Sequence, residues 1–271
     1  MVIVPGVHLI PIATPTFVMG MYPTNVYAIV AGKTALIDAG HTDEEAIGKM
    51  LEYIRNLAPP RLEYILLTHP HPDHAGGCSK IKEATGAKIV VHSTGTAHLE
   101  PYGVKADVIV HDGDALDIGG IMLKVIHTPG HTADSVCFYM QERRILFTGD
   151  HILGLGTPVI SRISGDMAQY IKSLERLLKY PIRLICPGHG PPVREPHRKI
   201  KELISHRKER EQQILSSLRY GRKSLTELVA EIYPELDQRL VELAKSQVTA
   251  HLKKLVEEDK VSVSGEEYTF R

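Results

Sequence analysis

The stretch Tyr64-Ile65-Leu66-Leu67-Thr68-His69-Pro70-His71-Pro72-Asp73-His74-Ala75-Gly76-Gly77 decides how the rest of this 271-residue chain is interpreted. Its first five residues form an apolar run that predicts a strand covered on both faces. Three imidazoles and one carboxylate follow within six residues. Such a cluster is costly unless a cation binds it, and neutral imidazole and carboxylate are ligands that suit zinc. The two prolines restrict the backbone of the loop.

Three more potential ligands each follow directly on a predicted strand. They are His131 in Thr128-Pro129-Gly130-His131-Thr132, Asp150 in Thr148-Gly149-Asp150, and His189 in Pro187-Gly188-His189-Gly190. In an extended loop His69 and His71 can point the same way, which leaves Asp73 and His74 to turn toward a second position. Seven ligands are enough for two metal ions with open positions for water.

Strand-like runs separated by glycine-rich turns dominate the first two thirds of the chain. The expected strands are Asn25–Val30, Ala35–Asp38, Tyr64–Thr68, Lys88–His92, Met122–His127, Ser135–Met140, Ile145–Thr148 and Leu184–Cys186. One expected helix is capped by Thr42 or Asp43 and runs to Asn56, and another is capped by Asp166. The pattern predicts an α+β protein in which two sheets pack together with helices outside, an αββα sandwich.

The pattern changes after Pro196. Residues 197–219 predict one long helix, and the stretches after it predict three shorter helices followed by two strands. These segments are Ser224–Tyr233, Pro234–Ala244, Ser246–Glu258, Lys260–Val263 and Glu267–Phe270. Helices followed by a terminal hairpin are typical of a winged-helix module. We therefore expect a catalytic domain at residues 1–195 and a helical linker with a winged-helix-like domain at residues 196–271.

Composition narrows the class of protein further. Lysine plus arginine and aspartate plus glutamate both number 32, so the overall charge indicates no polyanionic partner. The longest apolar runs are of strand length, which predicts no membrane span, and Met1–Ile12 lacks the pattern of a signal peptide. Cys78, Cys137 and Cys186 have no metal-ligand spacing and are expected to be buried thiols, which favours a reducing cytoplasm.

The ordered ligand set resembles that of the metallo-β-lactamase superfamily along essentially the whole chain, and this resemblance implies the αββα fold. It also implies that His69, His71 and His131 hold one metal, that Asp73, His74 and His189 hold the other, and that Asp150 bridges them. Asp38 matches a position that supports the ligand loop from behind, and a simple turn cap is the alternative. Two zinc ions are expected, although such ligands also accept iron or manganese.

Two divalent ions close together lower the pKa of a bridging water, so that hydroxide forms near neutral pH, and they polarise the substrate oxygen. Asp73, beside that water, is expected to orient it or to accept its proton in addition to binding metal. Cleavage of a phosphodiester also benefits from an acid that protonates the leaving oxygen. His151, next to Asp150, is a candidate for this proton donor, and the alternative is that its side chain points away from the site.

Branches of the superfamily differ at these positions. True β-lactamases of this fold usually carry cysteine where Asp150 stands, and the di-iron flavoproteins usually carry glutamate where His71 stands. Nucleases with a large cap domain need more than the 38 residues that separate Asp150 from His189. The segments that look like those of the β-lactamase-like protein 2 group are Gly149–Thr157, Pro187–Pro191, Ile204–Ile214 and Leu252–Leu255. That group joins this catalytic domain to a winged helix and is associated with endoribonuclease activity on single-stranded RNA.

We therefore expect a dinuclear metal-dependent hydrolase that cleaves single-stranded RNA. From Arg194 to Lys223 there are ten basic and four acidic residues, which can contact phosphates, and a solvated helix face is the competing interpretation. The candidate contacts are Arg194, Arg198, Lys199, Lys201, Arg207 and Lys208. One alternative is a hydroxyacylglutathione hydrolase-like thioesterase with the same metal chemistry. The other is a nucleic-acid-binding protein with a vestigial metal site, and the intact ligand set argues against it.

Overall fold

The computed structural model describes residues 1–13, 23–57, 61–161 and 163–271 of the chain. Its internal contacts divide the chain into two compact units. The first unit comprises Met1–Thr128, Asp134–Thr157 and Pro181–Pro196, and the second comprises Pro129–Ala133, Pro158–Tyr180 and His197–Arg271. None of the helices in the described ranges is both long and apolar enough to cross a membrane.

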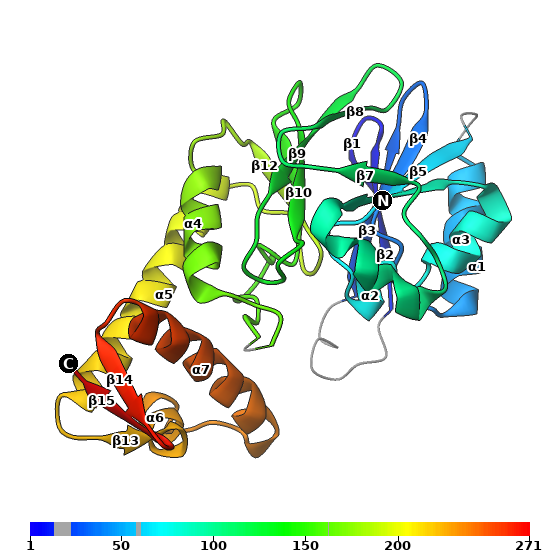
Figure 1. Ribbon diagram of the computed structural model, residues 1–271. Helices are drawn as coiled ribbons and strands as arrows, with labels where there is room; N and C mark the ends of the chain where they lie inside the picture. The colour runs from blue at the N-terminus through cyan, green and yellow to red at the C-terminus, as the bar shows by residue number, and fades with distance from the viewer. Residues whose placement is uncertain (14–22, 58–60, 162) are drawn as a thin grey trace. The chain divides into compact units, whose positions relative to one another are not determined.

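The larger of two sheets in the first unit has seven strands in the order β1-β2-β3-β4-β5-β6-β7 (Figure 1). They are β1 (Val2–Val4), β2 (Val7–Ile12), β3 (Thr24–Val30), β4 (Thr34–Ile37), β5 (Leu62–Leu66), β6 (Lys88–His92) and β7 (Val108–Val110). Neighbouring strands from β1 to β4 are antiparallel, whereas β4, β5, β6 and β7 run parallel. The four parallel strands therefore end at the same edge of the sheet.

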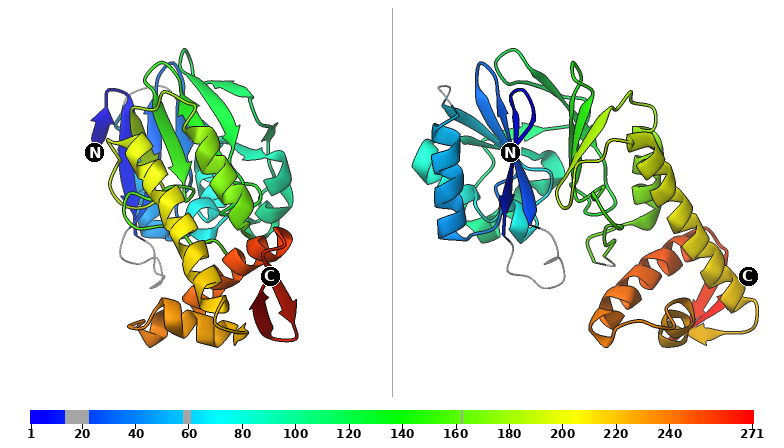
Figure 2. Two further views of the ribbon diagram at one scale, coloured as in Figure 1. Left: turned by 90° about the vertical axis from the view of Figure 1, so that its left-hand side faces the viewer. Right: turned by 180° about the vertical axis from the view of Figure 1, so that it is seen from behind.

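The smaller sheet has five strands in the order β12-β11-β10-β9-β8 (Figure 2). They are β8 (Ala115–Asp117), β9 (Met122–His127), β10 (Val136–Met140), β11 (Ile145–Gly149) and β12 (Leu184–Pro187). The pair β11 and β12 is parallel, and the other pairs are antiparallel. Side chains of both sheets share one core, in which the rings of Tyr27 and Phe147 meet edge to face with centroids 5.3 Å apart.

Helices cover the other face of the larger sheet. These are α1 (Glu44–Arg55) and α3 (Cys78–Thr85), with the short α2 (Pro72–Ala75) and the 3-10 segment η1 (Ser93–Tyr102). The predicted cap of α1 is confirmed, because the carboxylate of Asp43 accepts a hydrogen bond of 2.7 Å from the amide of Ala46. The apolar face of α1, which includes Ile47 and Met50, packs into a second core with the sheet.

The second unit is mostly helical. Its elements are α4 (Met167–Leu177), α5 (Pro196–Leu218, whose first residue belongs to the first unit), β13 (Lys223–Ser224), α6 (Leu225–Ile232), η2 (Gln238–Leu240), α7 (Val241–Glu257), β14 (Val261–Ser264) and β15 (Glu267–Phe270). The three strands form a sheet in the order β13-β15-β14, and α6, α7 and the terminal hairpin share a core with α5. Asp166 caps α4 as predicted, since its carboxylate accepts a hydrogen bond of 2.9 Å from the amide of Gln169.

One prediction for this unit is wrong. The segments Pro234–Ala244 and Ser246–Glu258 are not two helices, because α7 runs without a break from Val241 to Glu257. The chain contains no glycine or proline where the break was expected. Ala244 and Val248 lie one turn apart and are both buried, so the apolar face of the helix continues across that position.

A capping box determines where α6 begins. The hydroxyl of Ser224 accepts a hydrogen bond from the amide of Glu227 at 3.3 Å, and the carboxylate of Glu227 accepts one from the amide of Ser224 at 2.8 Å. Two amides at the helix terminus are thereby satisfied.

We expect Ser224→Ala to lower the free energy of unfolding of this unit by about 1 kcal/mol, because one amide of α6 loses its acceptor. Urea denaturation followed by circular dichroism would measure the change. Ser216→Ala, at an exposed position inside α5, is the matched control and should be neutral or slightly stabilising. Equal effects of the two substitutions would contradict the assigned role of the cap.

Candidate metal centre

The predicted ligands lie in loops that follow strands. β5 leads through Thr68 into the loop that carries His69 and His71, and His71 is the N-cap of α2 with Asp73 in its first turn. Asp150 follows β11 and His189 follows β12, and the parallel pairing of these strands brings both loops to one edge of the smaller sheet. These candidate ligands therefore lie where parallel strands end, whereas His131 follows β9, which pairs only with antiparallel neighbours.

Two groups of side chains in the described ranges have ligand atoms that lie within 4.8 Å of one another. One group is His69, His71, His131 and Asp150, and the other is Asp73, His74 and His189. These groups could hold metal ions, and between them they contain all seven residues predicted as ligands. The role of each residue as a ligand stays a prediction.

Short distances connect the members of these groups. Nε2 of His69 lies 2.9 Å from Nδ1 of His71, and Nε2 of His189 lies 3.1 Å from Oδ2 of Asp73. Oδ1 of Asp150 lies 3.3 Å from Nε2 of His74 and 3.4 Å from Nε2 of His189. Asp150 therefore contacts the second group although it is counted with the first, which is the position that a bridging carboxylate needs.

The backbone allows this close approach because position 188 is glycine. A Cβ atom on Gly188 would lie 2.6 Å from Oδ1 of Asp150 and 2.7 Å from Cε1 of His74. Both distances are shorter than side chains tolerate, so any larger residue would displace a candidate ligand.

Four imidazoles are oriented through their Nδ1 atoms. The partner of His69 is the hydroxyl of Thr68 at 3.1 Å, and the partner of His74 is the carboxylate of Asp38 at 2.8 Å. Nδ1 of His131 lies 2.7 Å from the carbonyl oxygen of Val159, and Nδ1 of His189 lies 3.2 Å from that of Pro23. With Nδ1 engaged in this way, Nε2 is the nitrogen that each ring offers to a cation.

Asp38 holds two parts of the ligand loop together. It has a left-handed backbone with φ of 63° just after β4, and its side chain is buried. Its carboxylate accepts hydrogen bonds from the amide of Thr68 at 2.8 Å and from the hydroxyl of Thr68 at 2.9 Å, besides its contact with His74. A turn cap would bond only to its own turn, whereas these contacts are made with residues of the ligand loop. They are the contacts expected of a residue that orients ligands.

The carboxylates of the site set its protonation. Burial disfavours a charge on His74, but Asp150, Asp73 and Asp38 outweigh it and raise the pKa of that imidazole well above 6.5. Burial likewise disfavours charge on Asp73 and Asp150, but the neighbouring imidazoles hold the pKa of Asp73 at about 2 and keep the pKa of Asp150 well below its usual range. The acids therefore stay ionised at neutral pH, and a bound divalent cation would replace protons on the imidazoles.

Sequence reasoning missed Asn25, which holds the His189 loop. The Asn25 side-chain amide donates to the carbonyl oxygens of Pro187 at 3.0 Å and Gly190 at 2.7 Å, and the hydroxyl of Tyr27 donates to Pro187 at 2.9 Å. No local sequence pattern predicts these contacts, because the partners are about 160 residues apart. They attach a loop of the smaller sheet to the first residues of β3 in the larger one.

Tyr102 was also not predicted to act at this site. Its hydroxyl donates a hydrogen bond of 2.7 Å to the carbonyl oxygen of Pro70, inside the ligand loop. Burial, with a contribution from Asp73, raises the pKa of Tyr102 to about 12, so the hydroxyl stays protonated and can serve as this donor.

The other predicted site residues are dispersed. His151 is buried beside Asp150 and belongs to neither group of potential ligands, so its role as a proton donor stays a prediction. Among the predicted RNA contacts, Lys199 forms an ion pair with Glu202 at 3.0 Å. The predicted RNA contacts that are exposed are Arg194, Arg198, Lys201 and Lys208.

The predicted RNA contact at Arg207 is wrong for this conformation. Its side chain is only 3% exposed and donates to the carbonyl oxygen of Pro158 at 2.6 Å and to the side chain of Gln247 at 3.2 Å. Its guanidinium also lies over the ring of Tyr170. The positive charge of Arg207 therefore stabilises the interior of the second unit instead of facing a ligand.

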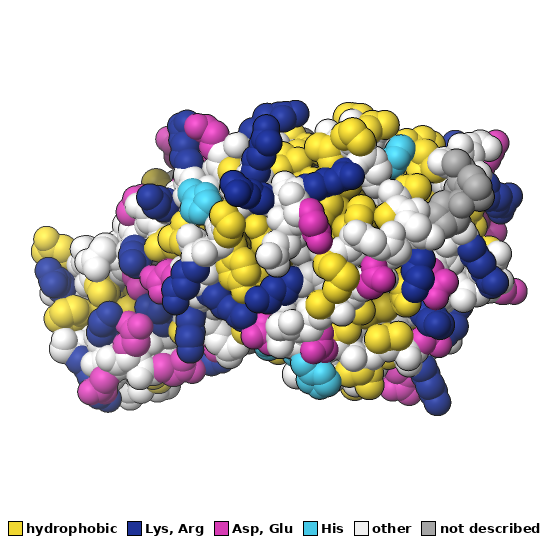
Figure 3. Space-filling model, turned by 90° about the horizontal axis from the view of Figure 1, so that it is seen from above, with side chains coloured by type: hydrophobic (Ala, Val, Ile, Leu, Met, Phe, Trp, Pro, Cys, Tyr) yellow, Lys and Arg dark blue, Asp and Glu magenta, His cyan; other side chains and the backbone are white. Residues whose placement is uncertain are grey.

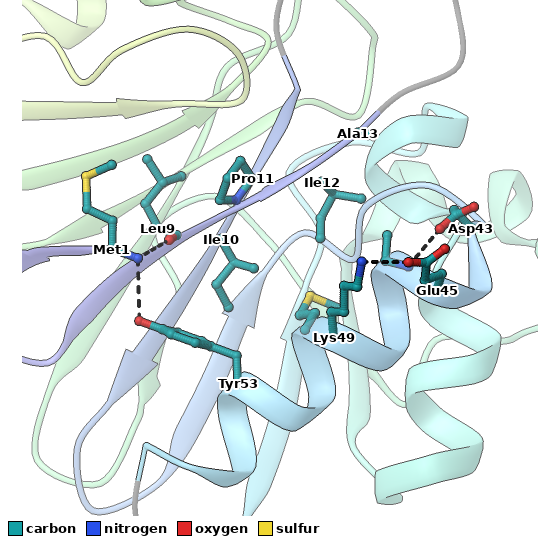
Figure 4. A pocket seen from close by; sticks show the side chains of 12 residues that line it. Met1, Leu9, Ile10, Pro11, Ile12, Ala13, Asp43, Glu45, Lys49 and Tyr53 are labelled. Atoms are coloured by element: carbon teal, nitrogen blue, oxygen red, sulfur yellow. Dashed lines mark hydrogen bonds and ion pairs between the residues drawn. The ribbon is translucent and has the colours of Figure 1, made fainter.

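A separate pocket of about 510 Å³ lies between β2 and α1 (Figure 4). Its walls include Leu9, Ile12 and Met50, and the ammonium group of Met1 donates there to the carbonyl oxygen of Leu9 at 2.8 Å. None of the seven candidate ligands lines it. The size of a pocket therefore does not indicate where the chemistry of this protein lies.

Comparisons with known proteins agree with the fold. The family model described as "Metallo-beta-lactamase superfamily" matches residues 19–189, and the one described as "Beta-lactamase associated winged helix domain" matches residues 224–269. A crystal structure of a metallo-beta-lactamase family protein from Thermus thermophilus superimposes with a TM-score of 0.81 at 26% identity and covers 100% of both chains. The predicted αββα fold and the C-terminal winged helix are thereby confirmed.

Two curated relatives are similar over most of the chain. The "Beta-lactamase-like protein 2 homolog" of Drosophila melanogaster is 35% identical over 261 residues, which cover 91% of this chain and 86% of that protein. The "Atrochrysone carboxyl ACP thioesterase" of Claviceps purpurea is 32% identical over 248 residues, which cover 88% of this chain and 76% of that protein. The relatives therefore include one named for hydrolysis of a thioester.

We expect the stabilisation by zinc to increase as the pH rises above 6.5. In the metal-free protein, protonated His74 and His189 have raised pKa values and contribute stability below pH 6.5 that is lost as the pH rises through those values. Zinc needs the neutral rings, and each tenfold gain in its affinity adds about 1.4 kcal/mol.

Thermal melts of zinc-loaded and chelator-treated protein, from pH of about 6 to about 9, would measure this difference. His41→Gln changes a histidine outside both groups and should keep the full pH dependence, whereas His74→Gln should reduce it. The same increase in Tm at every pH would show that these imidazoles do not exchange protons for metal.

Proposed function

The chain belongs to the metallo-β-lactamase superfamily of hydrolases, and we propose that it is a dinuclear zinc enzyme that cleaves single-stranded RNA. The main support is that two groups of ligand atoms lie next to each other and meet at Asp150. In this proposal His69, His71 and His131 would hold the first ion, Asp73, His74 and His189 would hold the second, and Asp150 would contribute to both. Iron or manganese would fit the same donors.

Bound metal would supply water of lowered pKa and polarise an oxygen of the substrate. The chain itself orients the candidate ligands. Thr68 holds the ring of His69, and Asp38 holds the ring of His74, each through the Nδ1 atom of the imidazole. Asp73, with a pKa of about 2, is too weak a base to keep a proton at neutral pH. Its proposed role is therefore to orient the attacking water by accepting a hydrogen bond.

A stripe of basic residues on α5 is the proposed contact for RNA. Arg198, Lys201 and Lys208 are exposed, and their spacing of three and seven residues places them on one side of the helix. Such a row can follow the phosphates of a single strand without reading its bases. The resemblance to the β-lactamase-like protein 2 group, which extends over both domains, supports RNA as the substrate.

A second candidate function is hydrolysis of thioesters. The observation that favours it is the similarity to a relative from Claviceps purpurea that is named as a thioesterase. The same ligands would serve, because a polarised carbonyl oxygen and an oriented water are also what acyl transfer requires. The two functions therefore differ in what binds beside the metal centre.

We expect Asp73→Asn to keep the fold and to lower turnover at least about 100-fold, because the amide neither orients water in the same way nor balances the charge of the metal. Zinc-loaded protein would be incubated with labelled single-stranded RNA, single-stranded DNA and a lactoyl thioester. Asp117→Asn, an exposed control, should leave activity unchanged.

The products of this assay distinguish the nuclease from the thioesterase. RNA cleavage that requires metal and is lost in Asp73→Asn supports the nuclease. Thioester turnover without RNA cleavage would replace it with the second candidate. RNA binding without turnover of any substrate would indicate a binding protein with an inactive centre.

We expect Lys201→Gln/Lys208→Gln to weaken RNA binding and to reduce the steepness of its salt dependence. Two lost phosphate contacts should lower the slope of log K against log salt concentration by about 1.4, since each contact on a single strand contributes about 0.7. Fluorescence anisotropy across a salt series would measure the slope. Lys172→Gln/Lys179→Gln removes the same charge elsewhere in the unit and should leave the slope unchanged.

A further inference from the structure

We propose that a hollow lined by four arginines binds a small organic molecule that carries several phosphate groups. The arginine hollow is formed by Arg143, Arg144, Arg183 and Arg194, and its volume is about 710 Å³. Its remaining lining residues are Glu142 and four apolar residues, Val4, Pro5, Ile145 and Leu184. All of these residues belong to the first unit.

The arginine hollow lies at the opposite end of the smaller sheet from the candidate metal centre. Arg144 precedes β11 and Asp150 follows it, while Arg183 precedes β12 and His189 follows it. Six residues at about 3.3 Å each separate Arg144 from Asp150, so the two sites are roughly 20 Å apart along the strand. A ligand in this hollow would therefore not touch the candidate metal ligands.

Positive charge is concentrated and uncompensated in the hollow. The lining contains four arginines and one glutamate, so the formal charge of its side chains is +3. Within the described ranges, no carboxylate lies within 4.0 Å of the side-chain nitrogens of these arginines, unlike Lys82 with Asp107 or Lys254 with Glu211. Like charges held this close repel one another, and a bound anion relieves that repulsion.

Backbone hydrogen bonds hold the main chain around these arginines in fixed relative positions. The carbonyl oxygen of Arg144 accepts hydrogen bonds from the amides of Arg183 at 2.8 Å and Leu184 at 3.3 Å. Arg144 itself has a left-handed backbone with φ of 56° in the turn between β10 and β11. Ile185 and Val193 exchange two hydrogen bonds of 3.0 and 2.9 Å, and Arg194 comes next in the chain.

Arg143 is anchored from the other sheet, because its guanidinium donates a hydrogen bond to the carbonyl oxygen of Pro5. The arginine hollow therefore combines turns from both sheets of the first unit. A site whose backbone is already arranged loses less entropy when its ligand binds.

The lining indicates the class of ligand. Guanidinium groups form paired hydrogen bonds with phosphate oxygens, and several together match several phosphates. The apolar residues would cover a ring or a sugar carbon face, and the volume is in the usual range for small-molecule sites. A nucleic-acid strand needs an extended track instead of a hollow, so a compact polyphosphate such as a nucleoside triphosphate fits better.

Figure 3 shows the face of the molecule that is seen from the top of Figure 1. Lysine and arginine side chains lie there among hydrophobic ones, with acidic side chains between them.

Titration calorimetry of the metal-loaded full chain with inorganic triphosphate would test the proposal. We expect one triphosphate to bind, orthophosphate to bind far more weakly, and added salt to reduce the affinity. Arg144→Gln/Arg183→Gln should weaken binding at least about tenfold, because two charge-assisted contacts are lost. Arg55→Gln/Lys105→Gln removes two exposed charges elsewhere in the unit and should bind as the unchanged chain does.

Several results would overturn the proposal. Triphosphate binding that persists in Arg144→Gln/Arg183→Gln would place the anion at the metal centre, and metal content measured before and after titration would reveal chelation. Equal weakening in the control variant would indicate diffuse attraction by surface charge. Binding of a short single-stranded RNA that is lost in Arg144→Gln/Arg183→Gln, without binding of triphosphate by the unchanged chain, would show that the arginine hollow serves a polynucleotide instead.

Discussion

The buried carboxylate of Asp38 is the interaction on which the candidate metal centre depends. It accepts hydrogen bonds from the amide and hydroxyl of Thr68 and contacts Nδ1 of His74, so it positions both the start and the end of the ligand loop. The hydroxyl of Thr68 in turn contacts Nδ1 of His69. An acid so deeply buried is tolerated because each of its oxygens has a partner. Its left-handed backbone is a further local cost that the surrounding sheet holds in place.

Around this anchor, the two sheets bring together loops that are far apart in sequence. Parallel strands end at one edge of each sheet, and contacts from Asn25 and Tyr27 hold the His189 loop against the larger sheet. The resulting site contains Asp73 and Asp150 beside several imidazoles in a largely buried space. Without a cation, protons on the imidazoles balance the negative charge of the carboxylates. The carboxylates raise the pKa values of His74 and His189 for this reason.

The number of basic residues in a stretch of sequence did not indicate which of their side chains are exposed to a ligand. The basic excess between Arg194 and Lys223 predicted phosphate contacts, yet Arg207 is buried against Pro158 and Tyr170. Long cationic side chains cover apolar surface as readily as they meet ligands, so a count cannot tell these uses apart. The arginine hollow illustrates the opposite case. Its members come from three separate places in the sequence between residues 143 and 194 and form no long basic run.

By itself the sequence indicated the candidate ligands, their order and the strands that precede them, because apolar periodicity and metal chemistry are local properties. It also indicated the caps at Asp43 and Asp166 and the terminal hairpin. Only the tertiary structure decided which ligands share a group, how Asn25 and Tyr102 hold the ligand loops, and that Arg207 is internal. These features arise from contacts between residues far apart in the chain, and no local pattern encodes a partner about 160 residues away.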